Sequence, residues 1–215
     1  MIAFDNRLPD PAACRVGLLA LRCATPPLDG DPLEPARLAL EADLRRAELR
    51  ASHPIDVYAA YYRRFRATYH VLLQVESTAA GRPMRRGLPL VQAMFMAELD
   101  GQLLTAGHDL DRLQPPVRLA LASGGERYAA LGGQQAVAVA GDLLLADGQG
   151  VLSTILQGPA AATAISAQTC AALYTVYAPA GIAAERVLAH LDAIAAYVRL
   201  CAPNAATVAS AVLGG

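Results

Sequence analysis

The sequence contains no lysine, so all eighteen of its basic residues are arginine. It also lacks any uninterrupted apolar run of the roughly 20 residues that a membrane-spanning helix requires, which argues against a membrane protein. Its N-terminus has no basic segment leading into an apolar one, so we expect no secretory signal and a cytoplasmic location. Charged residues make up only 17% of the chain and hydrophobic residues 54%, which argues against disorder and indicates a substantial core for 215 residues.

Several catalytic and binding motifs are absent as well. There is no Gly-x-Ser-x-Gly elbow, so a hydrolase triad of that type has no support. There is no Cys-x-x-Cys pair and no histidine at zinc-ligand spacing, so we expect no disulfide framework, no bound metal and no cofactor. We expect the cysteines to be reduced and mostly buried, and they are Cys14, Cys23, Cys170 and Cys201.

The arginines are distributed unevenly. Nine of them fall between residues 45 and 86, where only Glu48, Asp56 and Glu76 oppose them. The planar guanidinium group suits phosphate recognition, so this segment is the candidate nucleic-acid face. The alternative is a set of solvated helix faces in a protein whose genome prefers arginine to lysine. The candidate RNA contacts are Arg63, Arg64, Arg85 and Arg86.

Helical patterns dominate the first half of the chain. Residues 33–51 combine spaced leucines with strong helix formers and charges, which predicts a surface helix. A second helix begins at Pro54, and its aromatic face could stack on RNA bases or form part of the core. That face consists of Tyr58, Tyr61, Tyr62 and Phe65. Further helices are predicted over residues 70–78 and 90–100 and in the amphipathic segment that follows Pro179.

Short apolar runs separated by glycine-containing turns fill the chain from residue 103, which is typical of strands joined by tight hairpins. The predicted strands cover residues 14–24, 117–122, 136–140, 143–146, 151–156, 163–166 and 172–177. No internal repeat or linker is visible. We therefore predict one domain over residues 1–215 with a mixed α/β (α+β) fold, in which N-terminal helices pack on a largely antiparallel sheet.

Three ionisable side chains crowd into four residues at His108, Asp109 and Asp111. Imidazole and carboxylate groups can bind a metal ion, and an aspartate beside a histidine can tune a general base. Adjacent residues on a strand point to opposite faces, however. The cluster is equally typical of a polar turn at a strand end, where aspartates accept backbone N–H bonds.

A glycine pair followed by a glutamate stands at Gly124, Gly125 and Glu126. It lacks the strand–GxGxxG–helix context of a dinucleotide-binding loop. Paired glycines let a ligand approach the backbone closely, but a hairpin turn explains them equally well.

Taken together, these segments resemble the B3/4 domain of the phenylalanyl-tRNA synthetase beta subunit. The matching pieces are Asp109-Leu110-Asp111, Gly125-Glu126, Leu131-Gly132-Gly133, Leu143 to Asp147, Thr169 and the upstream Arg85-Arg86-Gly87-Leu88-Pro89. The similarity spans roughly residues 55–180, and each motif is short. In two places the sequence departs from the family pattern: Ala106 stands where the synthetase has a histidine, and Thr175 stands near an expected glutamate.

The resemblance implies a B3/4-like fold, contact with tRNA or aminoacyl-tRNA, and hydrolysis of a mischarged aminoacyl ester in trans. If the protein is an enzyme, the candidate catalytic residues are His108, Asp109 and Glu126, and the candidate substrate-binding residues are Asp111, Gly124, Gly125 and Thr169. A second hypothesis is a binding module for a small amino-acid-like ligand without catalysis. A third is a metal-dependent hydrolase that uses His108 with Asp109 or Asp111.

Overall fold

The computed structural model describes residues 3–27, 31–46 and 52–214. After β1 (Phe4–Asn6) and β2 (Cys14–Arg22), the chain forms α1 (Glu34–Arg46), α2 (His53–Arg63), α3 (His70–Ala79) and α4 (Pro89–Gly101). The strands that follow are β3 (Thr105–Asp109), β4 (Val117–Leu121), β5 (Arg127–Ala129), β6 (Gln135–Val137), β7 (Leu143–Ala146), β8 (Val151–Thr154), β9 (Gly158–Pro159) and β10 (Ala171–Pro179). The helix α5 (Ala184–Cys201) and the strand β11 (Ala206–Leu213) complete the fold.

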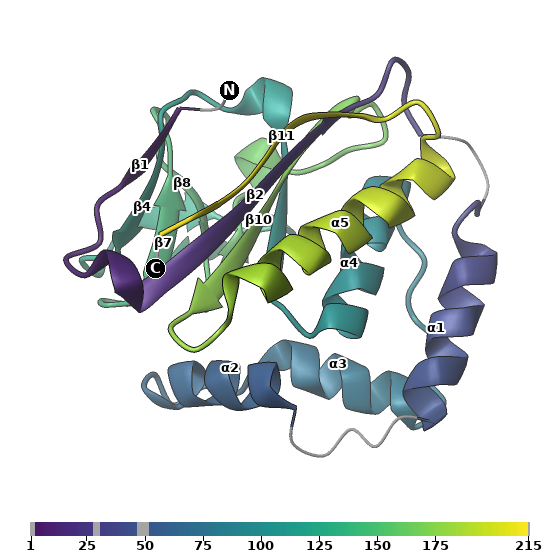
Figure 1. Cartoon of the computed structure of the whole chain (residues 1–215). Coiled ribbons are helices and arrows are strands. Elements are labelled where there is room, and N and C mark those ends of the chain that lie inside the picture. Colours follow the sequence, from purple (N-terminus) through teal and green to yellow (C-terminus); the bar gives the residue numbers. More distant parts are fainter. Residues whose placement is uncertain (1–2, 28–30, 47–51, 215) are drawn as a thin grey trace.

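Two larger sheets form the centre of the molecule (Figure 1). One is antiparallel with the order β11-β2-β10-β3, and the other has the order β1-β4-β7-β8-β9 with only β1 parallel to its neighbour. Side chains join the two sheets: the hydroxyl groups of Tyr177 on β10 and Ser153 on β8 are 2.6 Å apart. The polar contact is buried, because Tyr177 is 1% and Ser153 0% exposed.

The helix α5 packs across the first sheet against β2, the strand that contains Gly17 (Figure 1). A Cβ atom at Gly17 would lie 2.6 Å from Cγ1 of Val187 on α5. A glycine at this position therefore allows the close approach of helix and sheet. Val187, Leu191, Ile194 and Val198 are all buried, so they form the core-facing side of this helix, which the sequence predicted as amphipathic.

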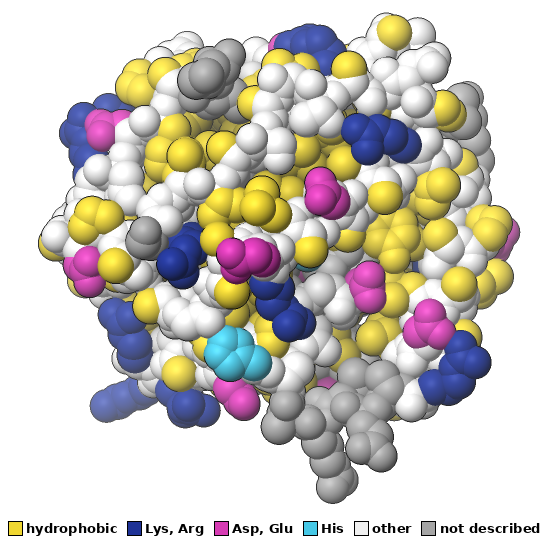
Figure 2. Space-filling model, viewed as in Figure 1, with side chains coloured by type: hydrophobic (Ala, Val, Ile, Leu, Met, Phe, Trp, Pro, Cys, Tyr) yellow, Lys and Arg dark blue, Asp and Glu magenta, His cyan; other side chains and the backbone are white. Residues whose placement is uncertain are grey.

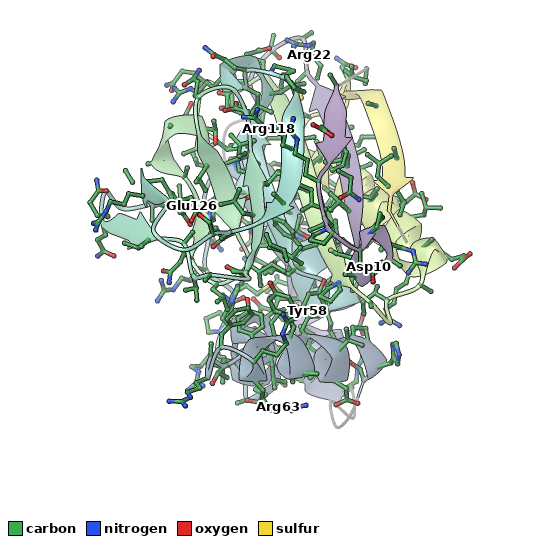
Figure 3. The ribbon with its side chains drawn as sticks, turned by 90° about the vertical axis from the view of Figure 1, so that its left-hand side faces the viewer. Asp10, Arg22, Tyr58, Arg63, Arg118 and Glu126 are labelled. Atoms are coloured by element: carbon green, nitrogen blue, oxygen red, sulfur yellow. The ribbon has the colours of Figure 1, made fainter. Side chains whose placement is uncertain are left out.

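The aromatic face of α2 belongs to the core. The hydroxyl of Tyr58 donates to the carbonyl of Tyr177, and the hydroxyl of Tyr62 donates to the carbonyl of Ile155 at 3.0 Å. Figure 3 shows Tyr58 on the side of α2 that faces the sheets and Arg63 on the opposite side. Of the two interpretations of this face, packing in the core is therefore the correct one, and base stacking by these tyrosines is not available.

The fold class predicted from the sequence is confirmed: helices from the N-terminal half pack on largely antiparallel sheets. The predicted helix over 33–51 ends at Arg46 in the described chain, and residues 47–51 lie outside the described residues. The strand predicted at 163–166 is wrong, because a short 3₁₀ helix (Ala161–Thr163) and a turn stand there. In that turn the Ser166 N–H donates to the Thr169 hydroxyl oxygen, which replaces a strand hydrogen bond.

The cysteines are free, and Cys14, Cys23 and Cys201 are buried while Cys170 is half-buried. Within residues 3–27, 31–46 and 52–214, no helix is long and apolar enough to cross a membrane.

Candidate functional site

His108 and Asp109 are neighbours on β3 but take part in different hydrogen-bond networks. His108 is completely buried, with Nδ1 2.9 Å from the Thr163 hydroxyl and Nε2 3.3 Å from the Ser153 hydroxyl. Burial lowers the pKa of His108 to about 4. The imidazole is therefore neutral near pH 7 and links β3 to β8 through Ser153.

Asp109 accepts hydrogen bonds from the segment that follows it and from the distant turn that contains Thr169. One carboxylate oxygen accepts the Asp111 N–H at 3.1 Å, and the other accepts the Thr169 hydroxyl at 2.7 Å. Two residues that the sequence suggested for one site, Asp109 and Thr169, are thus in direct contact. Asp111 is exposed and forms an ion pair with Arg22, whose nearest nitrogen is 2.6 Å away.

Glu126 lies in an exposed turn at the side of the sheets (Figure 3). Its carboxylate accepts the Ser123 N–H and hydroxyl, both at 2.7 Å, and the Gly124 N–H at 3.0 Å. Desolvation acts to raise the pKa of Glu126, but these hydrogen bonds outweigh it and lower the pKa. Gly124 and Gly125 have φ angles of 91° and 106°, values that favour glycine in a tight turn.

The structure therefore does not join the three proposed catalytic residues into one cluster. Among the described residues, no hydrogen bond or ion pair links Glu126 to His108 or Asp109. The described part of the chain also holds no group of three or more His, Cys, Asp and Glu residues placed to bind a metal ion.

A groove of about 780 Å³ lies between α3, α4 and the loop of residues 82–87 that connects them. We call it the arginine groove. Its lining comprises Leu73, Gln74, Ser77, Thr78, Arg82, Pro83, Met84, Arg85, Arg86, Gly87, Val91, Gln92, Met94 and Phe95. A volume of this size falls within the roughly 300–1,000 Å³ of small-ligand sites. The structure thus brings Arg85 and Arg86, but not His108 or Glu126, to this groove.

The three arginines of the groove differ in how they are held. Arg86 forms ion pairs with Asp31 at 3.3 Å and with Glu34 at 2.5 Å. The Nε of Arg82 donates to the Ser77 hydroxyl at 2.6 Å. Arg85 is exposed, and among the described residues neither it nor Arg82 forms an ion pair. The guanidinium groups of Arg82 and Arg85 are therefore the ones available to an incoming anion.

Arg63 and Arg64 precede α3 in the chain, whereas the arginines of the groove follow it. Arginine side chains gather over the C-terminal end of α2 in Figure 2, at the lower left. The guanidinium carbon of Arg64 lies 5.2 Å from the centre of the Tyr61 ring and 5.4 Å from that of Phe65. The ten residues of α3 span about 15 Å, so the two arginine groups are separate contact points.

Comparison with known proteins gives a similarity of fold. No family model matches the sequence, and no curated protein matches it. Among solved structures, the chain is similar to an N-terminal fragment of the phenylalanyl-tRNA synthetase beta subunit from Pyrococcus horikoshii, with a TM-score of 0.52 and 14% identity. The match covers 98% of this chain and 50% of that one, so the present chain spans about half the length of the fragment.

Proposed function

We propose that the protein binds RNA, and that its ligand is a tRNA or aminoacyl-tRNA whose single-stranded end enters the arginine groove. The observation that carries this proposal is the pairing of an apolar lining with three arginines at one groove. The fold neighbour supports it, since that fragment is part of the beta subunit of a phenylalanyl-tRNA synthetase.

The groove suits a strand end better than a duplex. Half-buried apolar side chains on α4, namely Val91, Met94 and Phe95, offer surfaces against which a ring can pack. Arg82 and Arg85 offer guanidinium groups to phosphate oxygens beside it. Arg63 and Arg64, which precede α3 in the chain, are positioned to contact a more distant part of the same RNA.

Reversal of two charges in the groove tests RNA binding. The double variant Arg82→Glu, Arg85→Glu should weaken tRNA binding by about 10- to 100-fold at moderate salt, because it removes two phosphate contacts and adds two repulsive charges. The slope of log K against log salt should fall by roughly 1.4, at about 0.7 per phosphate contact for single strands. Fluorescence anisotropy with labelled tRNA across a salt series measures both quantities.

A matched control changes the same charge elsewhere. Arg127 on β5 and Arg186 on α5 are exposed, and neither lines the arginine groove. The double variant Arg127→Glu, Arg186→Glu should keep at least half of the wild-type affinity. Equal losses in the two double variants would show that only the overall charge matters, and no tRNA retention at low salt would overturn the proposal.

Ester hydrolysis by His108, Asp109 and Glu126 stays a prediction from the sequence, as does binding of a small amino-acid-like ligand without catalysis. The phenylalanyl-tRNA synthetase domain that the sequence resembles hydrolyses tRNA mischarged with tyrosine, so a trans-editing activity implies that the protein deacylates tyrosyl-tRNA faster than phenylalanyl-tRNA. Deacylation rates measured with and without protein decide between these two predictions. Unchanged rates for both substrates would leave a binding function alone.

A further inference from the structure

One side-chain amide in the arginine groove has an unused hydrogen-bond donor. Gln92 on α4 is 5% exposed, and its Oε1 accepts the Gly87 N–H at 3.4 Å. Because an N–H group can only donate, this contact fixes which end of the amide is oxygen. The Nε2 atom is buried and has no hydrogen-bond partner in the described part of the chain. A buried donor without a partner destabilises the fold relative to one that is hydrogen-bonded.

A second amide faces the same groove from the other helix. Gln74 on α3 lines the groove, and its buried Oε1 has no partner among the described residues. Gln92 also lines a smaller adjoining pocket of about 260 Å³, which includes Arg86 and Gly87. The lining of the groove therefore includes a buried unused donor on α4 and a buried unused acceptor on α3, beside Arg82 and Arg85, which form no ion pair among the described residues.

This combination matches the groups of a nucleotide. The edge of every nucleobase carries donors and acceptors side by side, the two faces of the ring are apolar, and the phosphate is anionic. A free amino acid fits less well, because no aspartate or glutamate lines the groove within the described residues to meet its ammonium group. Asp31 lines the adjoining pocket, but its carboxylate already pairs with Arg37 and Arg86. The arginines would repel that ammonium group as well.

We propose that the arginine groove binds one unpaired nucleotide, with its base edge held by Gln74 and Gln92 and its phosphate by Arg82 and Arg85. The base packs against the apolar side chains of α4. This inference rests on the proposed function and specifies which part of the RNA enters the groove.

Titration with mononucleotides tests the inference. AMP and CMP should bind at least 10-fold more tightly than ribose 5-phosphate, which carries the phosphate without a base. Gln74→Leu leaves the charge unchanged and removes the whole amide, including the acceptor oxygen, so it should weaken AMP or CMP at least 5-fold while leaving ribose 5-phosphate within 2-fold. Gln92→Glu keeps the oxygen that accepts the Gly87 N–H and removes the donor, so it should weaken both nucleotides at least 10-fold. Isothermal titration calorimetry measures each affinity.

Controls separate this inference from its alternatives. Gln135 is exposed on β6, and Gln135→Glu reproduces the charge change of Gln92→Glu away from the groove without loss of nucleotide binding. Equal affinities for AMP and ribose 5-phosphate would overturn the nucleotide site, as would tyrosinamide binding more tightly than AMP. If tRNA binding that depends on Arg82 and Arg85 persists in those cases, only this inference fails. AMP binding without any tRNA binding would instead overturn the proposed function and retain the nucleotide site.

Discussion

Glu98→Gln should raise the free energy of unfolding at pH 8 by about 2–5 kcal/mol, with a much smaller change at pH 5. Glu98 on α4 is 5% exposed, and its Oε1 accepts the Thr105 N–H at 2.9 Å. Burial raises the pKa of Glu98 to about 8 from its ordinary value of 4.5. The substitution keeps an oxygen for the Thr105 N–H and removes the ionisable group.

The direction in which stability changes with pH depends on whether the folded or the unfolded chain binds the proton of Glu98 more tightly. The folded protein keeps Glu98 protonated up to about pH 8, whereas the unfolded chain releases that proton near pH 4.5. The contribution of Glu98 to stability is therefore fully present below pH 4.5 and is lost as the pH rises toward 8. The shift sets an upper limit of about 5 kcal/mol, at 1.36 kcal/mol for each pH unit.

Two buried histidines act in the opposite direction. Burial lowers the pKa of both His108 and His190 to about 4 from 6.5. Their contribution is fully present above pH 6.5 and is lost as the pH falls toward 4, because the unfolded chain takes up protons first. Between pH 4.5 and 6.5 the two histidines outweigh Glu98. Above pH 6.5 Glu98 is the one of these three groups whose contribution still changes, so their combined contribution to the stability of the wild type is largest near pH 6.5.

Urea denaturation at pH 5, 6.5 and 8 measures this profile. Glu98→Gln should abolish the decline between pH 6.5 and 8 and retain the decline below pH 6.5. Glu185 at the exposed start of α5 provides a matched control, and Glu185→Gln should leave the wild-type profile intact. A stability difference between Glu98→Gln and wild type that is the same at all three pH values would contradict a buried, titrating Glu98.

The helices were predictable because their local patterns agree with their packing. The aromatic face of α2 alternates with arginines, and the structure buries Tyr58, Tyr61 and Tyr62 while leaving Arg63 exposed. The strand β11 was not predicted, because its small residues are mostly exposed or half-buried along its length and show no regular alternation.

The candidate site was only partly predictable. The basic loop that contains Arg85 and Arg86 stands out by composition, and Asp109 and Thr169, suggested from motifs, are in contact. Nothing in the sequence marks Gln92, because an isolated glutamine on a helix belongs to no motif. Only the packing of α3 beside α4 places an unused amide donor in a groove with arginines.

Asp142→Ala should lower the free energy of unfolding by about 3–5 kcal/mol, because one buried carboxylate holds together three parts of the fold. Asp142 is completely buried. Its Oδ1 accepts the Tyr61 hydroxyl of α2 at 2.7 Å, and its Oδ2 accepts the Leu156 N–H beyond β8 at 3.0 Å. The Tyr61 hydroxyl oxygen in turn accepts the Leu143 N–H at the start of β7, at 2.8 Å.

The expected loss of stability in Asp142→Ala comes from the buried groups that lose their hydrogen-bond acceptor. Without the carboxylate, the Tyr61 O–H and the Leu156 N–H have no acceptor in the interior. Each buried unpaired group costs about 1–3 kcal/mol. Asp142→Asn keeps one acceptor oxygen, so it should cost less than Asp142→Ala. Urea denaturation of all variants at pH 6.5 gives these differences directly.

A double-mutant cycle shows whether the hydrogen bond between Tyr61 and Asp142 contributes to holding α2 against the rest of the fold. Tyr61→Phe alone leaves Asp142 Oδ1 and the Leu143 N–H without their shared partner. Once Asp142 is alanine, the Tyr61 O–H has already lost its acceptor, so the same substitution removes only the hydrogen bond from the Leu143 N–H. The double variant should therefore be more stable than the sum of the single effects predicts, by at least 1 kcal/mol. Additive effects would mean that Tyr61 and Asp142 stabilise the fold independently, and α2 would then be held mainly by Tyr58 and Tyr62.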